Sequence, residues 1–195
     1  CAGSPYTITV TVNPAPVVTN PATTSVCNGA TLNINLTASV ASSFSWTIGT
    51  ITGSITGATA GSGSTINQVL TNPSNTTAGT VQYIVTPTST TGSCPGNPYT
   101  ITDSVNPKPV GSASPHPICS GITRSVALNS TASGTTFTWT NPTIITTPTG
   151  GTITGFSNCA SACGTTIAQT LTNTGTTNGV IRYTVTPTAN GCTGS

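Results

Sequence analysis

The sequence has very few charged residues. Asp, Glu, Lys and Arg make up 2% of its 195 residues, against about 25% in an average soluble domain. They are Asp103, Lys108, Arg124 and Arg182, and His116 is the only imidazole. A net charge of +2 carried by three separate basic residues makes no basic patch. We therefore expect no nucleic-acid binding and no electrostatic attachment to a membrane, because both depend on clustered Lys and Arg.

The usual catalytic and metal-binding groups are scarce as well. General acid–base catalysis usually needs two ionisable groups in one pocket, and the chain has a single carboxylate, Asp103. His116 lies between two prolines in "SPHPICSG". A structural zinc or calcium site needs four or more suitable ligands, more than one His, one Asp and a C-x-x-x-C pair supply. The sequence predicts no enzyme, no cofactor, no catalytic residue and no metal.

Long apolar runs are absent too. No stretch of eighteen apolar residues occurs and no charged, signal-like segment opens the chain, so we expect no membrane insertion. Methionine is missing throughout, which suggests a processed chain or a segment of something longer.

What the sequence does contain is an internal repeat. The opening "CAGSPYTITVTVNPAP" returns from Cys94 as "CPGNPYTITDSVNPKP". Other segments recur in the same order, namely "FSWT" as "FTWT", "INQVLTN" as "IAQTLTN" and "VQYIVTPT" as "IRYTVTPT". Such a period indicates tandem copies of one unit. We interpret residues 1–13 as the last strand of a preceding module, residues 14–106 as the first module, and residues 107–195 as a second module that lacks its last strand.

Apolar and polar residues alternate along many short segments, as in "TLNINLTA" and "VQYIVT". A period of two with one apolar face predicts antiparallel strands packed on one side. About seven such strands per module, with a Trp after the first Cys and a Tyr-x-Val strand near the end, predict an all-β fold of two tandem immunoglobulin-like sandwiches. The predicted core aromatics are Trp46, Trp139, Tyr83 and Tyr183. Gln68 and Gln169 have the same parity as apolar neighbours, so we expect them to satisfy backbone groups of a turn.

Seven cysteines are present, and the repeat suggests how they pair. If both copies have the same connectivity, the bridges are Cys27–Cys94 and Cys119–Cys192. Cys159 and Cys163, in "NCASAC", are close enough in sequence for a local bridge. Cys1 is then left over as an inter-module or inter-chain cysteine. Disulfides persist in oxidising compartments, so we expect a secreted or surface-displayed protein.

The combination of W-T, Y-x-V-T-P, G-x-C-x-G and V-N-P-x-P resembles the PKD-like, immunoglobulin-like repeats of very large surface adhesins of Bacteroidota. Gliding-motility adhesins of the SprB type, exported by type IX secretion, are the best-known examples. The resemblance covers both copies and implies a low-charge extracellular stalk or filament. In that phylum Asp103-Ser104-Val105 also resembles a short O-glycosylation acceptor, which makes Ser104 a candidate for modification.

Two kinds of function are compatible with these features. In the first, tandem sandwiches form a structural stalk, joined by the semi-rigid proline segments "VNPAPVV" and "VNPKPVG". In the second, residues 141–165 form a loop that binds a glycan or a surface, with Phe156 as its one aromatic residue. The expected partners are neighbouring modules or protomers of the same filament, together with surface glycans under the second hypothesis.

The free first strand has two interpretations of its own. Protomers could donate residues 5–13 to a neighbour's second module, or the chain could be a window from one continuous polypeptide. Because "CTGS" at the end corresponds to "CAGS" at the start, Cys1 and Cys192 would compete for one partner under donation. This redundancy favours the continuous chain.

Overall fold

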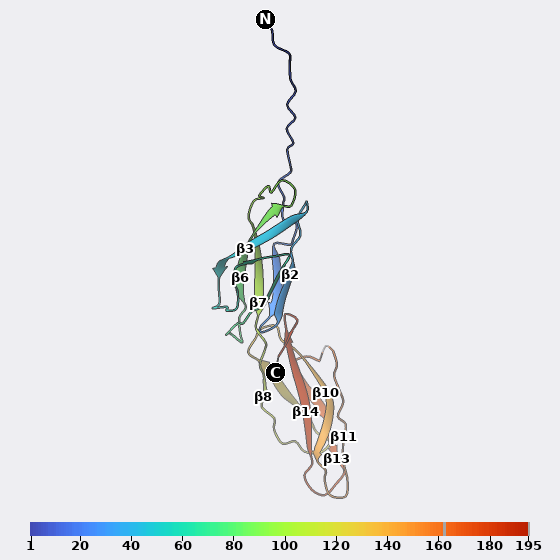
Figure 1. Cartoon of the computed structure of the whole chain (residues 1–195). Helices are drawn as coiled ribbons and strands as arrows, with labels where there is room; N and C mark the ends of the chain where they lie inside the picture. The colour runs from blue at the N-terminus through green and yellow to red at the C-terminus, as the bar shows by residue number, and fades with distance from the viewer. Residues whose placement is uncertain (162, 195) are drawn as a thin grey trace. The chain divides into compact units, whose positions relative to one another are not determined.

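The computed structural model describes residues 1–161 and 163–194 and is built from β-strands and loops (Figure 1). The predicted all-β class is confirmed. Residues 1–13 precede the first strand and belong to none. In chain order the strands are β1 Thr23–Cys27, β2 Thr31–Asn35, β3 Ser42–Ile51, β4 Gly61–Ser62, β5 Thr65–Val69, β6 Gly79–Ser89, β7 Tyr99–Asn106, β8 Gly111–Ala113, β9 Thr123–Ser130, β10 Thr136–Thr146, β11 Ile153–Thr154, β12 Thr166–Thr170, β13 Thr172–Asn173, β14 Val180–Ala189 and β15 Cys192–Thr193.

The first module is a sandwich of two sheets. One sheet has the strand order β1-β7-β6-β3-β4, and the other pairs β2 with β5. β3 and β6 are antiparallel and place Trp46 opposite Val85. Every second residue of β6 is buried, as expected for a central strand with one face on the core. The core is formed by the inner faces of both sheets, as in immunoglobulin-like sandwiches.

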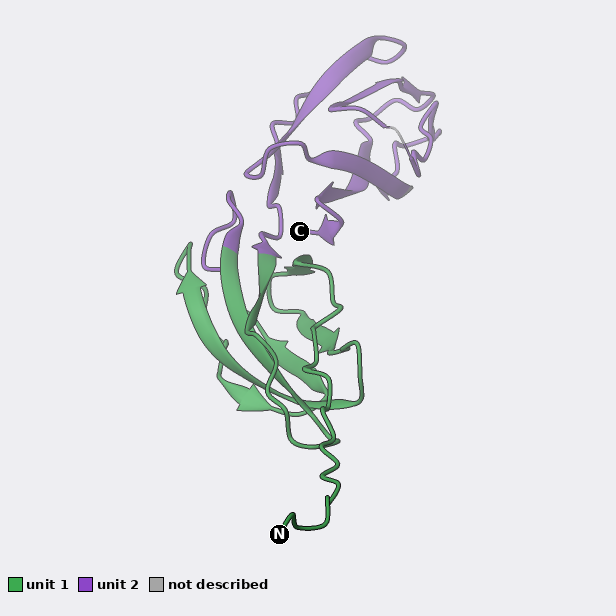
Figure 2. Ribbon diagram, turned by 90° about the horizontal axis from the view of Figure 1, so that it is seen from above, with its two compact units in different colours: residues 1–71, 80–104 green, residues 72–79, 105–195 purple. Residues whose placement is uncertain are grey.

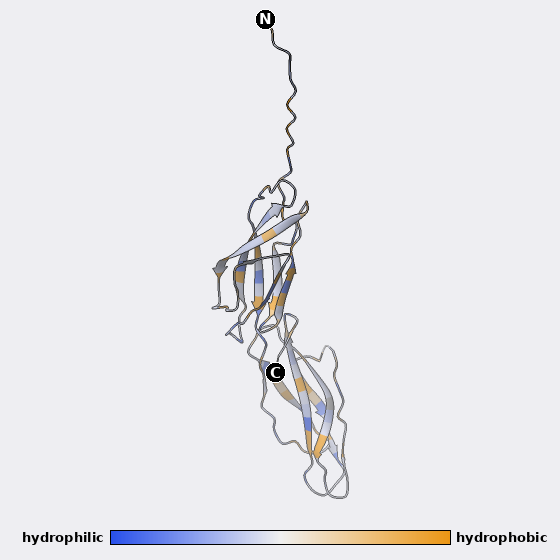
Figure 3. Cartoon of the chain, in the orientation of Figure 1, coloured by the Kyte–Doolittle hydropathy of each residue, from blue (hydrophilic) through white to orange (hydrophobic). Residues whose placement is uncertain are grey.

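The second module repeats much of this arrangement. β14 pairs with β10 and, over its last two residues, with β15. β9 lies between β12 and β8 in a second sheet, and β11 pairs with β13. β14 is the counterpart of β6. Within the described residues no strand takes the place beside β14 that β7 takes beside β6. Figure 3 shows that hydrophobic and polar positions alternate along the strands of both modules.

Two compact units divide the chain slightly differently from the repeat (Figure 2). One unit consists of Cys1–Thr71 with Thr80–Ser104, and the other of Asn72–Gly79 with Val105–Ser195. In the latter, the Thr131 hydroxyl donates a hydrogen bond to the Asn75 carbonyl at 2.7 Å. The loop at 72–79 is therefore grouped with the second module, although the repeat assigns it to the first. Among the residues that the structure describes, no helix is long and apolar enough to cross a membrane.

Candidate joining sites of the modules

The centre of the first module contains a polar network around one turn carbonyl. The Trp46 indole donates to the Thr59 carbonyl at 3.1 Å, and Gln68 Nε2 donates to the same oxygen at 2.7 Å. Thr59 N and the Tyr83 hydroxyl donate to Gln68 Oε1 at 3.1 and 2.9 Å. Gln68 thus satisfies the turn at Thr59. Trp46 and Tyr83 lie in the core, 7% and 0% exposed.

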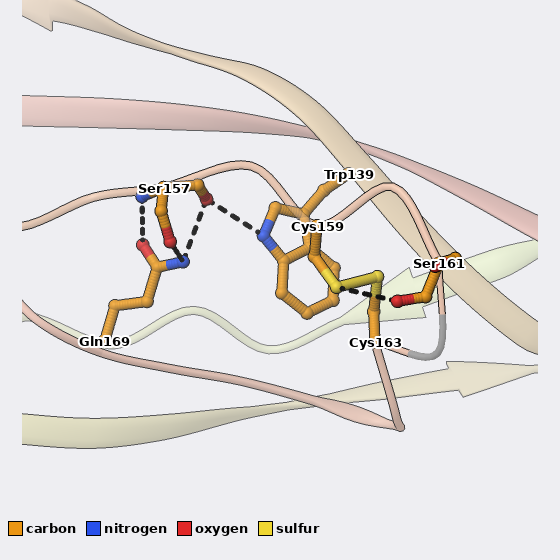
Figure 4. The surroundings of a disulfide bond; sticks show 6 residues. All are labelled: Trp139, Ser157, Cys159, Ser161, Cys163 and Gln169. Atoms are coloured by element: carbon orange, nitrogen blue, oxygen red, sulfur yellow. Dashed lines mark hydrogen bonds between the residues drawn. A yellow bond between two sulfur atoms is a disulfide. The ribbon is translucent and has the colours of Figure 1, made fainter.

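The second module has the same network around Ser157. The Trp139 indole and Gln169 Nε2 donate to the Ser157 carbonyl at 3.2 and 2.9 Å (Figure 4). Ser157 N and the Tyr183 hydroxyl donate to Gln169 Oε1 at 3.0 and 2.8 Å. Trp139 is 5% exposed, whereas Tyr183 is only partly buried. In both modules, the Trp, the Tyr and the Gln side chain therefore have a structural role.

Comparison with known protein families also finds two copies of one domain in the sequence. The sequence matches the PKD-like domain family over residues 24–109 and again over residues 116–195. The chain belongs to the PKD-like domain family. No curated protein matches the sequence. PKD-like domains are generally structural modules without catalytic activity, and they are often extracellular. The tandem PKD-like repeat is thereby confirmed, together with its immunoglobulin-like sandwich fold.

Within the described residues, the few ionisable side chains of these PKD-like modules do not gather in one site. His116 and Lys108 are exposed in the segment between the modules, whereas Asp103 is 0% exposed in β7. Within residues 1–161 and 163–194, no group of three His, Cys, Asp or Glu side chains could hold a metal ion.

Asp103 is the one buried carboxyl group of the first PKD-like module. Neither of its carboxylate oxygens has a hydrogen-bond partner. Burial raises the pKa of Asp103 to about 6. Burial and the nearby charge of Asp103 together raise the pKa of Tyr83 to about 12. The neighbouring Ser104 is half-buried in the middle of β7. Its O-glycosylation stays a prediction.

Cys159 and Cys163 form a disulfide, with an S–S distance of 2.07 Å and a Cα–Cα distance of 5.6 Å (Figure 4). Cys159 exchanges two backbone hydrogen bonds with Trp139, at 2.9 and 2.8 Å. In the first PKD-like module Gly61 occupies the corresponding place opposite Trp46. The disulfide therefore belongs to an edge segment that packs against the core Trp. Residues 141–146, expected to begin a binding loop, instead continue β10.

The two expected long bridges, Cys27–Cys94 and Cys119–Cys192, are contradicted by the structure. Cys94 and Cys119 are free thiols, and so is Cys1. Cys27 and Cys192 are each disulfide-bonded. The repeat therefore does not pair the two cysteines of one module with each other.

The reason is that the two cysteines of each expected pair lie near opposite ends of a long strand, β6 in the first module and β14 in the second. Gly29, two residues after Cys27, donates to the Leu70 carbonyl, just before the loop that leads into β6. Ser89, the last residue of β6, donates to the Cys94 carbonyl at 2.9 Å. An eleven-residue strand is about 33 Å long, whereas disulfide-bonded cysteines have Cα atoms about 4.4–6.8 Å apart. The second PKD-like module repeats the geometry, because Cys192 pairs with Ala189 at the end of β14.

The entrance to each PKD-like module is built from a proline and a glycine. Gly96 and Gly194, each two residues after a cysteine, donate to the carbonyls of Pro87 and Pro187 at 2.8 and 2.9 Å. A Cβ added to Gly96 would collide with the carbonyl oxygen of Pro16, and one added to Gly194 with that of Pro109. Pro16 and Pro109 are fully buried. The proline segments expected to be semi-rigid joints are thus packed against the module that they enter.

Proposed function

We propose that the chain is a structural segment of a long extracellular surface adhesin or filament, in which PKD-like modules form a disulfide-stiffened stalk. The observation that carries this proposal is the identical construction of the two module entrances. The buried prolines Pro16 and Pro109 pack in the same way against Gly96 and Gly194. A joint repeated in this form suits modules that are strung in series.

The chemistry of the surface supports the same function. A chain with 2% charged residues and many Thr and Ser side chains has little with which to bind charged ligands. The resemblance to SprB-type gliding-motility adhesins adds a location, the outer surface of a bacterial cell.

Electron microscopy of the native gene product tests this proposal. The expected result is extended particles or filaments on the cell surface, labelled by an antibody against the two modules. Labelling confined to the cell interior would contradict it. Glycan-array binding that is lost in the Phe156→Ala variant would favour the glycan-binding function instead.

A further inference from the structure

The first module has a hollow of about 210 Å³ beside its strands β1 and β2. β1 is the outermost strand of the five-stranded sheet, and among the described residues β2 pairs only with β5 in the other sheet. The residues that line the hollow come from these two strands, from β7 and from the segment just before β1. They all belong to one compact unit, so the hollow is a feature of the first module alone.

The bottom of this hollow is apolar and its rim is polar. Ile34 and Ile101 form the bottom, and they are 8% and 1% exposed. The polar residues of the rim are Asn20, Thr23, Thr24, Asn33 and Asn35. No ionisable side chain lines the hollow. A ligand that matches it is therefore uncharged and has both an apolar face and several hydrogen-bonding groups.

The backbone of β2 presents unpaired groups to the hollow. Hydrogen-bonded and non-hydrogen-bonded pairs alternate along two antiparallel strands, and Leu36 N donates to Ser64 O at 2.9 Å. The N–H and C=O groups of Asn35 and Asn33, at the alternate positions of β2, therefore point away from β5. Asn20 Nδ2 donates to one of them, the Asn35 carbonyl, at 2.7 Å. The described residues provide no partner for the N–H and C=O of Asn33.

This uncovered part of the β2 edge is short. On one side it ends at the segment before β1, where Thr37 N donates to Asn20 Oδ1 at 2.8 Å. On the other side it ends at a tight turn, in which Ala30 N donates to the Cys27 carbonyl at 2.9 Å. Only Asn33 and its immediate neighbours lie between, which is less than an ordinary strand of about five or six residues needs. A compact ligand fits this gap better than an added peptide strand.

Two of the rim amides are held in place by the protein itself. Both polar atoms of the Asn20 side chain are bonded to the backbone near the end of β2. Asn35 Oδ1 accepts a hydrogen bond from the Thr65 hydroxyl at 3.1 Å, which leaves Asn35 Nδ2 available as a donor. Such fixed amides lower the entropy cost of binding a polar ligand, because they are ordered beforehand.

The second module lacks these amides at the corresponding positions. Alignment of "CNGATLNINLTA" with "CSGITRSVALNS" places Ser125 and Ala127 where the first module has Asn33 and Asn35. A PKD-like module therefore folds without asparagine at these two places. The amides are a property of the first module that its fold does not require.

We propose that this hollow binds one neutral sugar ring of a glycan. A sugar hydroxyl both donates and accepts hydrogen bonds, so it can pair with the N–H or C=O of Asn33 and with the amide of Asn35. The C–H face of a pyranose ring would lie on Ile34 and Ile101. A hollow of about 210 Å³ is smaller than the pockets of about 300–1,000 Å³ that hold drug-sized ligands, which favours a single ring. The site goes beyond the stalk function and is separate from the loop that contains Phe156.

Amide-detected NMR titration of the full chain tests the proposal. The probes are the methyl glycosides of glucose, galactose and mannose, each added up to about 100 mM, because a ligand of about a dozen heavy atoms binds in the millimolar range. At least one of them should shift the backbone amides of Thr24, Asn33 and Asn35 in a saturable way. The amide of Phe156 should stay unchanged.

Loss of one rim amide should weaken binding measurably. Asn33→Ala should raise the dissociation constant by about fivefold, as for one lost hydrogen bond. Asn67→Ala is the matched control, since Asn67 lies opposite Asn33 on β5, is also exposed and does not line the hollow. It should change the dissociation constant by less than about twofold.

Loss of the rim hydroxyls provides a second test with little change in shape. Replacing Thr23 and Thr24 together by Val should weaken binding by at least about tenfold, because two hydrogen-bonding groups are lost. Thr31→Val is the control, since Thr31 is an exposed residue of β2 outside the lining of the hollow. The rest of the amide spectrum should stay as in the wild type, which shows that the variants are folded.

Three results would overturn the proposal. The first is the absence of saturable shifts with all three glycosides. The second is an equal effect of Asn33→Ala and Asn67→Ala, because the sugar would then bind elsewhere on the exposed face. The third is tighter binding of glucuronic acid than of the neutral sugars. None of these results would affect the stalk proposal, which depends on microscopy of the native gene product.

Discussion

Tyr83 and Val85 are fully buried in the first module, whereas Tyr183 and Val185 at the same positions of the second module are only partly buried. Both modules nevertheless hold their Trp, Gln and Tyr in the same hydrogen-bond network. The difference lies in one strand, β7, which the second module lacks within the described residues. The comparison teaches that the network at the centre of a PKD-like module forms without the last strand, whereas full burial of the core needs it.

Removing the central Trp should have the largest effect and should be equal in the two modules. Trp46→Ala and Trp139→Ala each leave a cavity and remove one of the two side-chain hydrogen bonds to the turn carbonyl. We expect each to lower the free energy of unfolding of its own module by about 3–5 kcal/mol. Differential scanning calorimetry, which records both transitions, checks this, and the fluorescence of the remaining Trp identifies the transition of the unchanged module. A much smaller effect of Trp139→Ala would mean that the centre of the second module is packed more loosely than that of the first.

The pH dependence of stability should be confined to the first module. Burial raises the pKa of Asp103 from 3.8 to about 6, so the folded module binds the proton more tightly than the unfolded chain. Stability is therefore highest below about pH 4 and falls as the pH rises through about 6. The loss should be at most about 3 kcal/mol.

Asp103→Val is the matched variant, since Val10 stands at the same position of residues 5–13. It should stabilise the first module at pH 7 and abolish this pH dependence. Urea unfolding at pH 4 and pH 7 measures both. Because Asp103 is the only acidic side chain of the chain, the second module should unfold alike at the two pH values. A first module that is more stable at pH 7 than at pH 4 would show that Asp103 has an ionic partner when folded.

Loss of the local disulfide should affect only the second module. Replacing Cys159 and Cys163 together by Ser removes a cross-link that closes a short loop, with an expected cost of about 2 kcal/mol. Differential scanning calorimetry should show the second transition at a lower temperature and the first unchanged. An unchanged second transition would indicate that this segment does not help to hold Trp139.

Truncation of one core valine should have the smallest effect and should differ between modules. Val85→Ala should cost about 2 kcal/mol, because Val85 is fully buried. Val185→Ala should cost about half as much, because its side chain is already partly exposed. Urea unfolding of the two variants measures both costs. Equal costs would show that the core of the second module is covered as fully as that of the first.

Much of the fold could be predicted from local patterns. The alternation along "VQYIVT" and the recurrence of "FSWT" as "FTWT" indicated strands, a two-fold repeat and the core Trp residues, because such patterns depend only on neighbours in the chain. Gln68 and Gln169 were recognisable from their parity with apolar residues. Asp103 was recognisable only as a charged residue in a strand, and its burial came from the sheet order that encloses β7.

The local bridge Cys159–Cys163 was recognisable from its spacing and is confirmed, but the long-range cysteine pairs could not be assigned by the same reasoning. Equivalence between the copies gave the wrong bridges, Cys27–Cys94 and Cys119–Cys192, because it shows which cysteines correspond but not which ends of a module they occupy. The domain boundaries at 13/14 and 106/107, and the assignment of residues 1–13 to a preceding module, stay predictions. Residues 1–13 form no strand in the structure, and their apolar side chains are exposed.

The sequence by itself determined the strand pattern, the repeat and the scarcity of chemical groups, since each of these follows from residue types and spacing. Only the tertiary structure decided where the cysteines lie and that Asp103 is buried. Both depend on the direction in which strands run and on which strand is beside which. Those are long-range pairings that a period of two residues does not encode.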